Sequence, residues 1–173
     1  MAEENSLDRA STVVAARRRR DMSDSSMPHV PWLTIAIAGS IAGVLDIGAA
    51  ALIYSARPDR ILQAIAAGLL GRESYSDGAW SSVLGFVLQV LMSCLIAAVY
   101  VIAARRLPAL RRNWIIAGLA YGVIVFGVMN YVVMPLSAVG KSPTFTAARF
   151  VENLAAMLVF GLIITFIDRR REA

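Results

Sequence analysis

Four long runs of apolar residues divide this chain, and short polar segments rich in arginine separate them. An α-helix rises about 1.5 Å per residue, so about 20 consecutive apolar residues cross a bilayer core of about 30 Å. Each run has about that length, and tryptophan or tyrosine stands near the ends of the first three, as expected where a helix meets the membrane–water interface. The pattern therefore predicts four membrane-spanning helices, at about residues 32–54, 79–104, 113–133 and 147–167.

A shorter apolar segment, residues 61–71, lies between the first two runs and is too short to cross a bilayer. Its large apolar residues share one face at helical spacing, which is typical of a helix lying in the membrane interface. They are Ile61, Leu62, Ile65 and Leu69. We therefore predict a helix at about residues 59–71 that serves either as a packing lid on the bundle or as a cap that gates a pocket, and we prefer packing. The predicted fold class is all-α: a four-helix transmembrane bundle with one short interfacial helix in the first outer loop.

Composition agrees with a membrane protein. Hydrophobic residues make up 58% of the 173 residues and charged residues 17%, which is too apolar for an ordinary soluble domain. Residues 1–31 are polar and contain the arginine run 17–20, so we predict a disordered basic tail. Residues 169–173 form a second basic end, and the transmembrane domain covers residues 32–168.

The net charge of +5 comes mostly from arginines at the ends of the spans. If the N-terminus lies in the cytoplasm, twelve basic residues fall on the cytoplasmic side and five on the outer side. The positive-inside rule therefore predicts that both termini are cytoplasmic. Arginine clusters at span ends suit anionic lipid headgroups, and no basic groove with interleaved aromatic residues indicates a nucleic-acid partner.

Cofactor chemistry has little support in this sequence. The single cysteine, Cys94, lies in an apolar run, which excludes an intrachain disulfide and a Cys-x-x-Cys pair. The single histidine, His29, precedes the first span, which excludes haem held between two membrane histidines and argues against a histidine-rich metal site. We therefore expect no cofactor and no metal site.

Asp46 is the only charged residue of the first span. An ionisable side chain inside a membrane helix is costly and often functional. At helical steps of 100° per residue, Gly39 and Gly43 lie on the side of Asp46, whereas Val44 and Leu52 lie opposite. We therefore predict that Asp46 faces the bundle interior, that the two glycines allow close helix packing, and that the large aliphatic residues meet lipid.

Other polar residues fall in the same outer half of the predicted membrane. Gln89 should stand at the depth of Asp46, and further polar residues lie in the outer turns of the third and fourth spans. We predict that these side chains surround a cavity that opens outward and is closed on the inner side, where we expect no comparable polar group. The candidate residues are Asp46, Gln89, Asn130, Arg149 and Glu152. They form a ligand site, a satisfied polar network that locks the bundle, or a proton or ion path.

Three segments resemble a family of uncharacterised bacterial four-span membrane proteins: residues 61–71, the Arg-Arg-Leu-Pro sequence at 105–108, and residues 129–137. The resemblance covers about residues 35–165 and implies a multi-pass protein of the bacterial inner membrane, but no activity. Small multidrug-resistance transporters are similar in carrying an acidic residue in the first of four helices. Here that residue is aspartate instead of glutamate and the first outer loop is long, so the similarity is an analogy.

The leading functional hypothesis is a non-enzymatic inner-membrane protein whose outward-facing polar pocket binds a small polar or cationic ligand or stabilises a partner. That partner would be a second copy of the chain or another membrane protein. The alternative is a proton-coupled transporter of small molecules that uses Asp46. A membrane-embedded enzyme comes third: Asp46 and Glu152 could form an acid–base pair, but no nucleophile–base or metal constellation accompanies them.

Overall fold

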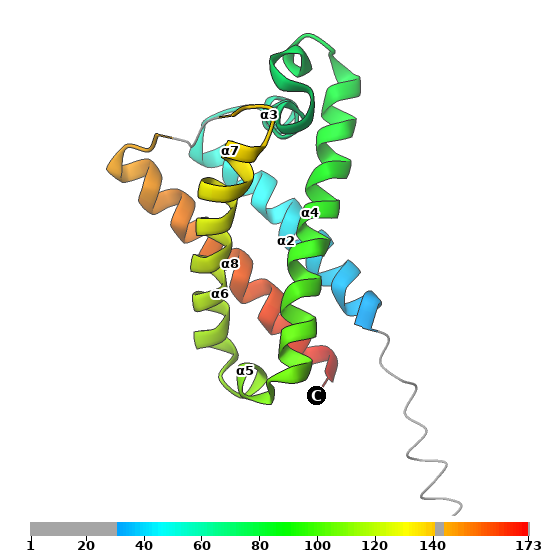
Figure 1. Ribbon diagram of the computed structural model, residues 1–173, viewed down its shortest axis with the longest axis vertical. Helices are drawn as coiled ribbons and strands as arrows, with labels where there is room; N and C mark the ends of the chain where they lie inside the picture. The colour runs from blue at the N-terminus through cyan, green and yellow to red at the C-terminus, as the bar shows by residue number, and fades with distance from the viewer. Residues whose placement is uncertain (1–30, 141–143, 173) are drawn as a thin grey trace, which may run out of the picture. The chain divides into compact units, whose positions relative to one another are not determined.

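The computed structural model of the protein describes residues 31–140 and 144–172. The predicted disordered tail, residues 1–31, therefore lies outside the described residues except for Pro31. In the described part, four helices are long and apolar enough to cross a membrane, and no strand is present. The predicted all-α four-helix fold is confirmed (Figure 1).

The long helices begin and end close to the predicted spans. They are α2 (Pro31–Ile53), α4 (Ala79–Arg106), α8 (Ala147–Glu172) and a divided crossing segment, Trp114–Leu136. The divided segment consists of α6 (Trp114–Val128), a wider π-helical turn η2 (Met129–Val133) and the single turn α7 (Met134–Leu136). Short helices connect the long ones: α3 (Pro58–Leu70), η1 (Gly71–Tyr75) and α5 (Pro108–Arg112).

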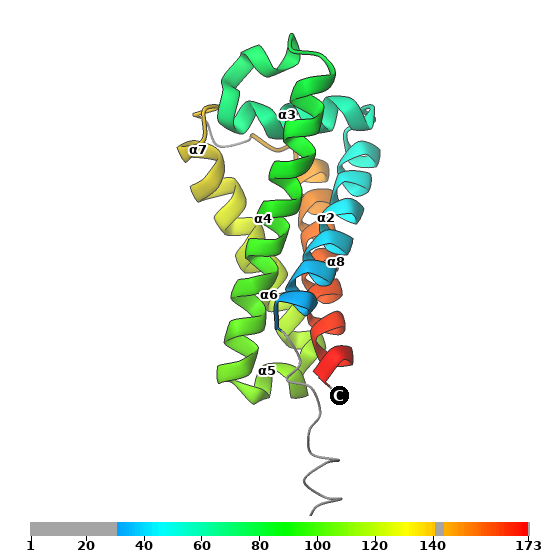
Figure 2. The same cartoon turned by 90° about the vertical axis from the view of Figure 1, so that its right-hand side faces the viewer.

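The long helices are neighbours in the order α4, α2, α8 and α6 (Figures 1 and 2). α2 contacts both α4 and α8, and α8 also contacts α6. Side chains join α4 to α6, because the Tyr121 hydroxyl donates to the Ile96 carbonyl at 2.6 Å and the rings of Tyr100 and Tyr121 lie 5.3 Å apart. Phe160 and Ile164 of α8 pack against the same core.

Small residues set the spacing within two helix pairs. A Cβ added to Gly39 of α2 would lie 2.6 Å from a backbone atom of α4, and one added to Gly43 would lie 2.6 Å from Ser93 Oγ. Between α6 and α8, Gly161 lies directly against the backbone of Gly118. Close approach of this kind is a common way for helices to associate in membranes. The pairs α2–α4 and α6–α8 are therefore tightly packed.

The two faces of α2 follow the sequence pattern. Gly39, Ala42 and Gly43 are buried, whereas Val44 and Leu52 are exposed, Leu52 at 82%. Asp46 is half-buried. The helix thus presents its small residues to the bundle and its large aliphatic residues to the surroundings.

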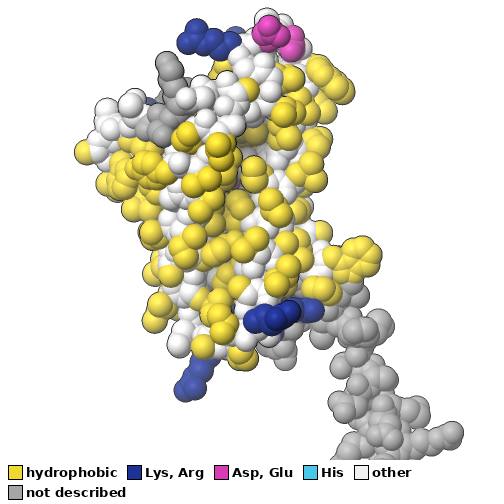
Figure 3. Space-filling view, in the orientation of Figure 1, with side chains coloured by type: hydrophobic (Ala, Val, Ile, Leu, Met, Phe, Trp, Pro, Cys, Tyr) yellow, Lys and Arg dark blue, Asp and Glu magenta, His cyan; other side chains and the backbone are white. Residues whose placement is uncertain are grey.

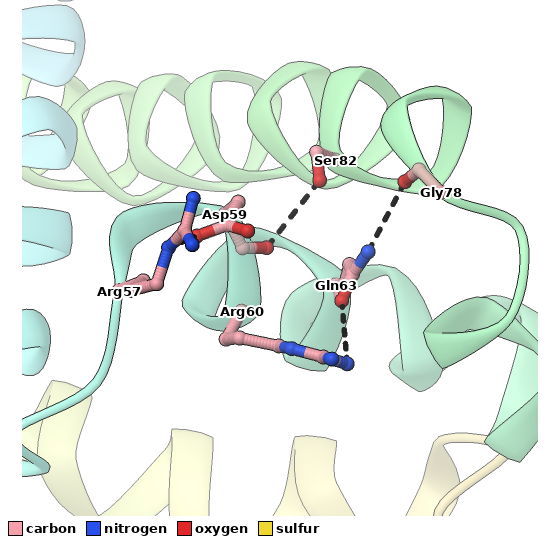
Figure 4. A network of polar contacts seen from close by, with 6 residues as sticks. All are labelled: Arg57, Asp59, Arg60, Gln63, Gly78 and Ser82. Atoms are coloured by element: carbon pink, nitrogen blue, oxygen red, sulfur yellow. Dashed lines mark hydrogen bonds and ion pairs between the residues drawn. The ribbon is translucent and has the colours of Figure 1, made fainter.

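α3 lies across one end of the bundle, which we call the α3 end, and packs on α4 (Figures 1 and 4). The side-chain amide of Gln63 donates to the Gly78 carbonyl at 3.1 Å, and Arg60 donates to the side-chain oxygen of Gln63 at 3.2 Å. On the other side, the backbone N–H of Ala138 donates to the Gly68 carbonyl at 2.8 Å. These bonds fix α3 to the start of α4 and to the segment after α7, as expected of a packing element.

The buried side of α3 differs from the apolar face that its sequence predicts. Its buried residues are Gln63, Ala66 and Ala67, whereas Leu69 is 63% exposed. The physical reason is the close crossing with α4, where Gly85 lies directly against the Leu62 carbonyl. This crossing brings the backbone of α3 against α4, and Gln63 and the two alanines occupy the buried side.

The opposite end of the bundle holds a buried ion pair that the sequence pattern did not reveal. This arginine-rich end is formed by α5 and the last turns of α4 and α8. Asp168 is 0% exposed there, and Arg111 donates to its two carboxylate oxygens at 2.9 Å and 3.4 Å. Thr165, one turn earlier in α8, is also buried.

The expectation that the inner half carries no comparable polar group is therefore wrong. Asp168 stands at the end of the fourth predicted span, beside a run of arginines. In the structure α5 folds against α8 and brings Arg111 over the carboxylate. The burial of Asp168 thus depends on a tertiary contact that its neighbours in the sequence do not indicate.

We expect Gly43→Leu to lower the free energy of unfolding by about 1–3 kcal/mol, because the new side chain must displace the Ser93 side chain of α4. Val44→Leu, on the exposed face one residue later, should change it by less than about 0.5 kcal/mol. Thermal unfolding in detergent micelles measures both. Equal losses in the two variants would contradict the assignment of the α2 faces.

We expect Asp168→Asn to lower the free energy of unfolding by about 3 kcal/mol, because it removes the countercharge of a partly buried guanidinium group. The control is Asp59→Asn, which breaks the exposed ion pair between Arg57 and Asp59 at 3.2 Å and should cost less than about 1 kcal/mol. Denaturant titrations in micelles compare the two. A loss at Asp168 as small as that at Asp59 would show that the buried pair contributes little to stability.

Candidate functional site

Asp46 and Gln89 form a hydrogen-bonded pair between α2 and α4. The side-chain amide of Gln89 donates to Asp46 Oδ2 at 2.9 Å and to the Gly43 carbonyl at 3.5 Å. The close approach of α2 to α4 at Gly43 allows the Gln89 side chain to form both hydrogen bonds. Among the described residues, no basic side chain forms an ion pair with Asp46. The carboxylate is therefore hydrogen-bonded but has no countercharge in this part of the chain.

A groove of about 340 Å³ lies between α2 and α8, and Asp46 lines it. Among the described residues that line it, Glu152 of α8 is the one other charged side chain. The remaining walls are apolar, formed by Ala42, Leu45, Ala49, Leu52, Ile53, Ala155, Ala156, Val159, Phe160 and Ile163. Residues 42–53 of α2 span about 16 Å along the helix axis, so the groove is long as well as apolar. It can accommodate an extended apolar group beside a carboxylate.

The groove adjoins a second, wider hollow of about 600 Å³ toward the α3 end of α2 and α8. The two share Leu52, Ile53 and Glu152, and polar residues such as Ser55 and Thr146 join them in the wider hollow. No residue of α3 lines either space. α3 therefore covers the α4 side of this end and leaves the mouth of the groove open.

Arg149 stands at this mouth, where its side chain contacts Glu152 and Tyr54. Its guanidinium nitrogen lies 3.6 Å from Glu152 Oε2, and its guanidinium carbon lies 5.1 Å from the centre of the Tyr54 ring. The Tyr54 hydroxyl in turn donates to Asn153 Oδ1 at 3.2 Å. Arg149 thus offsets the charge of Glu152, on the rim, but makes no contact with Asp46. An aromatic residue at a span end is a usual interfacial anchor, but the contacts of Tyr54 with Arg149 and Asn153 do not follow from the sequence pattern.

Asn130 does not join the other candidates. It lies in the π-helical turn of the third crossing segment, where its side-chain amide donates to the Phe126 carbonyl at 2.8 Å. That segment contributes no residue to the groove, because α6 packs on a different side of α8 from α2. The structure therefore places Asp46 against Gln89, adds Glu152 on the same groove and Arg149 at its mouth, and leaves Asn130 apart.

The chemistry open to this site is binding through charge and apolar contact. The described residues contain no group of three or more histidine, cysteine or acidic side chains that could hold a metal ion. Asp46 offers a carboxylate beside an apolar wall, and Gln89 fixes one of its oxygens in place. Such an arrangement suits a cationic group attached to an apolar body better than a hydrated metal ion, which requires several oxygen ligands.

Comparison of the chain with protein-family models, with curated proteins and with solved structures found no match. The assignment of a function therefore depends on the geometry of the groove.

Proposed function

We propose that this chain is a membrane protein whose α2–α8 groove binds an organic cation that carries an apolar substituent. The observation that carries the proposal is Asp46: a carboxylate without a countercharge among the described residues, lining a groove whose other walls are almost entirely apolar. This narrows the ligand expected from the sequence, a small polar or cationic molecule, to one that is both cationic and partly apolar.

The Asp46 carboxylate carries a free-energy cost inside a membrane. An aspartate near the middle of a membrane helix costs about 2.5–3.5 kcal/mol on insertion scales. The amide of Gln89 supplies a hydrogen bond but no charge. A bound cation would supply the missing charge, and in a site shielded from water that attraction is stronger than at an exposed carboxylate.

The apolar walls of the groove determine which chemical group the ligand carries in addition to its positive charge. Leu45, Ala49 and Val159 lie along the groove on either side of Asp46. Burying an alkyl chain against such walls contributes about 0.8 kcal/mol per methylene group. The ligand is therefore expected to place its charged head near Asp46 and its apolar body along α2 and α8, with the mouth near Glu152 as its entrance.

A proton-coupled transporter is the second candidate, and the difference between the two ends of the bundle favours it. The groove opens toward the α3 end, whereas Arg111 and Asp168 join α5 to α8 at the opposite end. Alternating access requires states that are open on one side and closed on the other. Counterflow of a labelled cation in liposomes would separate transport from binding alone.

We also propose, from the arginine distribution and the family resemblance, that the protein lies in a bacterial inner membrane with both termini in the cytoplasm. The arginine-rich end would then face the cytoplasm, and the mouth of the groove would face outward.

We expect Asp46→Asn to weaken binding of decyltrimethylammonium at least tenfold, about 1.4 kcal/mol, because the amide keeps the shape of the side chain but cannot supply its charge. Isothermal titration in lipid nanodiscs measures the affinity, and decanol serves as the uncharged probe that should not distinguish the two proteins. Asp59→Asn, an acidic residue of α3 outside the groove, is the control and should bind as the parent does. If the parent and the Asp46→Asn variant bind the cation equally, the carboxylate serves only to hold Gln89 and the polar network is structural.

The orientation is tested with single cysteines in a Cys94→Ala background. Asp77→Cys, exposed before α4, should react with a membrane-impermeant maleimide in intact spheroplasts. Ala109→Cys, exposed in α5, should react only after the membrane is permeabilised. The reverse pattern would place the mouth of the groove on the cytoplasmic side and contradict the proposed orientation.

A further inference from the structure

We propose that the arginine-rich end carries a binding site for the phosphate of an anionic phospholipid, built by Arg169 and Arg170 of α8 on the aromatic rings of Trp114 and Phe166. This site lies apart from the α2–α8 groove and does not depend on the function proposed for it. The arginine clusters at the span ends predict anionic lipid in general, and these four residues assign one such lipid a defined position.

The geometry of these four residues is unlike that of ordinary surface arginines. The guanidinium carbon of Arg169 lies 5.6 Å from the centre of the Trp114 ring, and that of Arg170 lies 5.2 Å from the Phe166 ring. The two rings contact each other, with centres 5.6 Å apart. Trp114 opens α6 and Phe166 belongs to α8, so one aromatic pair, formed across two packed helices, supports both guanidinium groups.

A guanidinium group on an aromatic face keeps its N–H donors available in its own plane. These donors match the oxygens of a phosphate group, which arginine binds through two parallel hydrogen bonds. The ring contact also restricts the long side chain before any ligand arrives, which reduces the entropy lost on binding. Arg169 and Arg170 are both exposed, so their donors are accessible.

The acidic side chains described at this end do not neutralise the two arginines. Asp168, their neighbour in α8, is buried and bonded to Arg111. Arg169 and Arg170 form no ion pair with a described acidic side chain. On the face drawn in Figure 3, acidic side chains are visible only near the α3 end, where a basic side chain lies beside them, whereas only basic side chains are visible at the opposite end. The charge of the site is thus complementary to a phosphate group.

The surface beside the arginines favours a phospholipid over a free anion. Ile115 and Ile116 follow Trp114 in α6 and are 51% and 70% exposed, and Phe166 is 42% exposed. A phospholipid with its phosphate at the arginines would place its acyl chains against these apolar side chains of α6 and α8. A soluble phosphate would use only the arginines and leave this apolar surface uncovered.

The test compares two double variants of equal net charge. Arg169→Gln with Arg170→Gln removes the ring-supported arginines. Arg106→Gln with Arg112→Gln removes two exposed arginines of the same end that contact no aromatic ring or acidic side chain among the described residues. Phosphatidylglycerol and phosphatidylcholine with identical acyl chains are offered in equal amounts in micelles, and native mass spectrometry measures the lipid that stays bound.

We expect the parent protein to retain phosphatidylglycerol at least fivefold over phosphatidylcholine. The variant at 169 and 170 should lose most of this preference, whereas the variant at 106 and 112 should keep it within twofold. Equal losses in the two variants would show that binding reflects only net charge and would overturn the site. A parent protein with no preference, or one stabilised as much by inorganic phosphate as by phosphatidylglycerol in thermal unfolding, would overturn the choice of a phospholipid.

Trp114→Leu supplies a separate test of the ring contact, because it changes no charge. We expect the preference for phosphatidylglycerol over phosphatidylcholine to be at least twofold lower in this variant than in the parent. Gel filtration checks that the variant is folded and elutes as the parent does. A folded Trp114→Leu protein with unchanged preference would contradict the role of the aromatic support.

Discussion

The short distance between α2 and α4 at Gly39 and Gly43 determines how the rest of the bundle is arranged. Side chains at these positions would collide with α4, so only glycine permits the approach that lets Gln89 reach Asp46. α6 and α8 approach each other in the same way at Gly118 and Gly161. The bundle therefore consists of two tight helix pairs, and the groove lies where the pairs meet, between α2 and α8. Tight packing within the pairs and looser packing between them place the groove beside Asp46.

The two ends of the bundle are built in different ways. At one end, α3 is held on α4 by Gln63 and covers that side only, so the space between α2 and α8 stays open. At the other end, Arg111 of α5 donates to Asp168 of α8. This bond joins the connection between α4 and α6 to the last turns of α8. A short connecting helix is used at each end, but among the ion pairs of the described residues the one in the interior belongs to the helix at the arginine-rich end. The groove is therefore open toward the α3 end, and the buried ion pair lies at the opposite end.

The sequence predicted what depends on local pattern and missed what depends on the order of the helices. Hydrophobic length was enough to predict the spans, and helical periodicity with depth was enough to set Asp46 and Gln89 at one level. Asn130 is polar and falls in the same half of the membrane, but the sequence does not say that its helix lies on the far side of α8 from the groove. The ion pair of Asp168 was not predicted, because nothing in its sequence neighbourhood indicates that α5 folds back over it. Leu69 shares a face with other apolar residues of α3, yet the helix packs on α4 in an orientation that buries Gln63, Ala66 and Ala67 and leaves Leu69 exposed.

The two carboxylates of the bundle interior offer the clearest argument about function. Both carry the free-energy cost of a charge removed from water. For Asp168, which is completely buried, the chain provides a guanidinium group that bonds both carboxylate oxygens and compensates for the loss of water. For Asp46 it provides one amide, a half-buried position and a place on the wall of a groove, while the nearest arginine of the mouth, Arg149, pairs with Glu152 instead. The same fold thus contains a fully compensated carboxylate and an incompletely compensated one. A countercharge that the described chain does not supply to Asp46 is one that a ligand can supply, and the apolar walls beside it determine what kind of ligand that is.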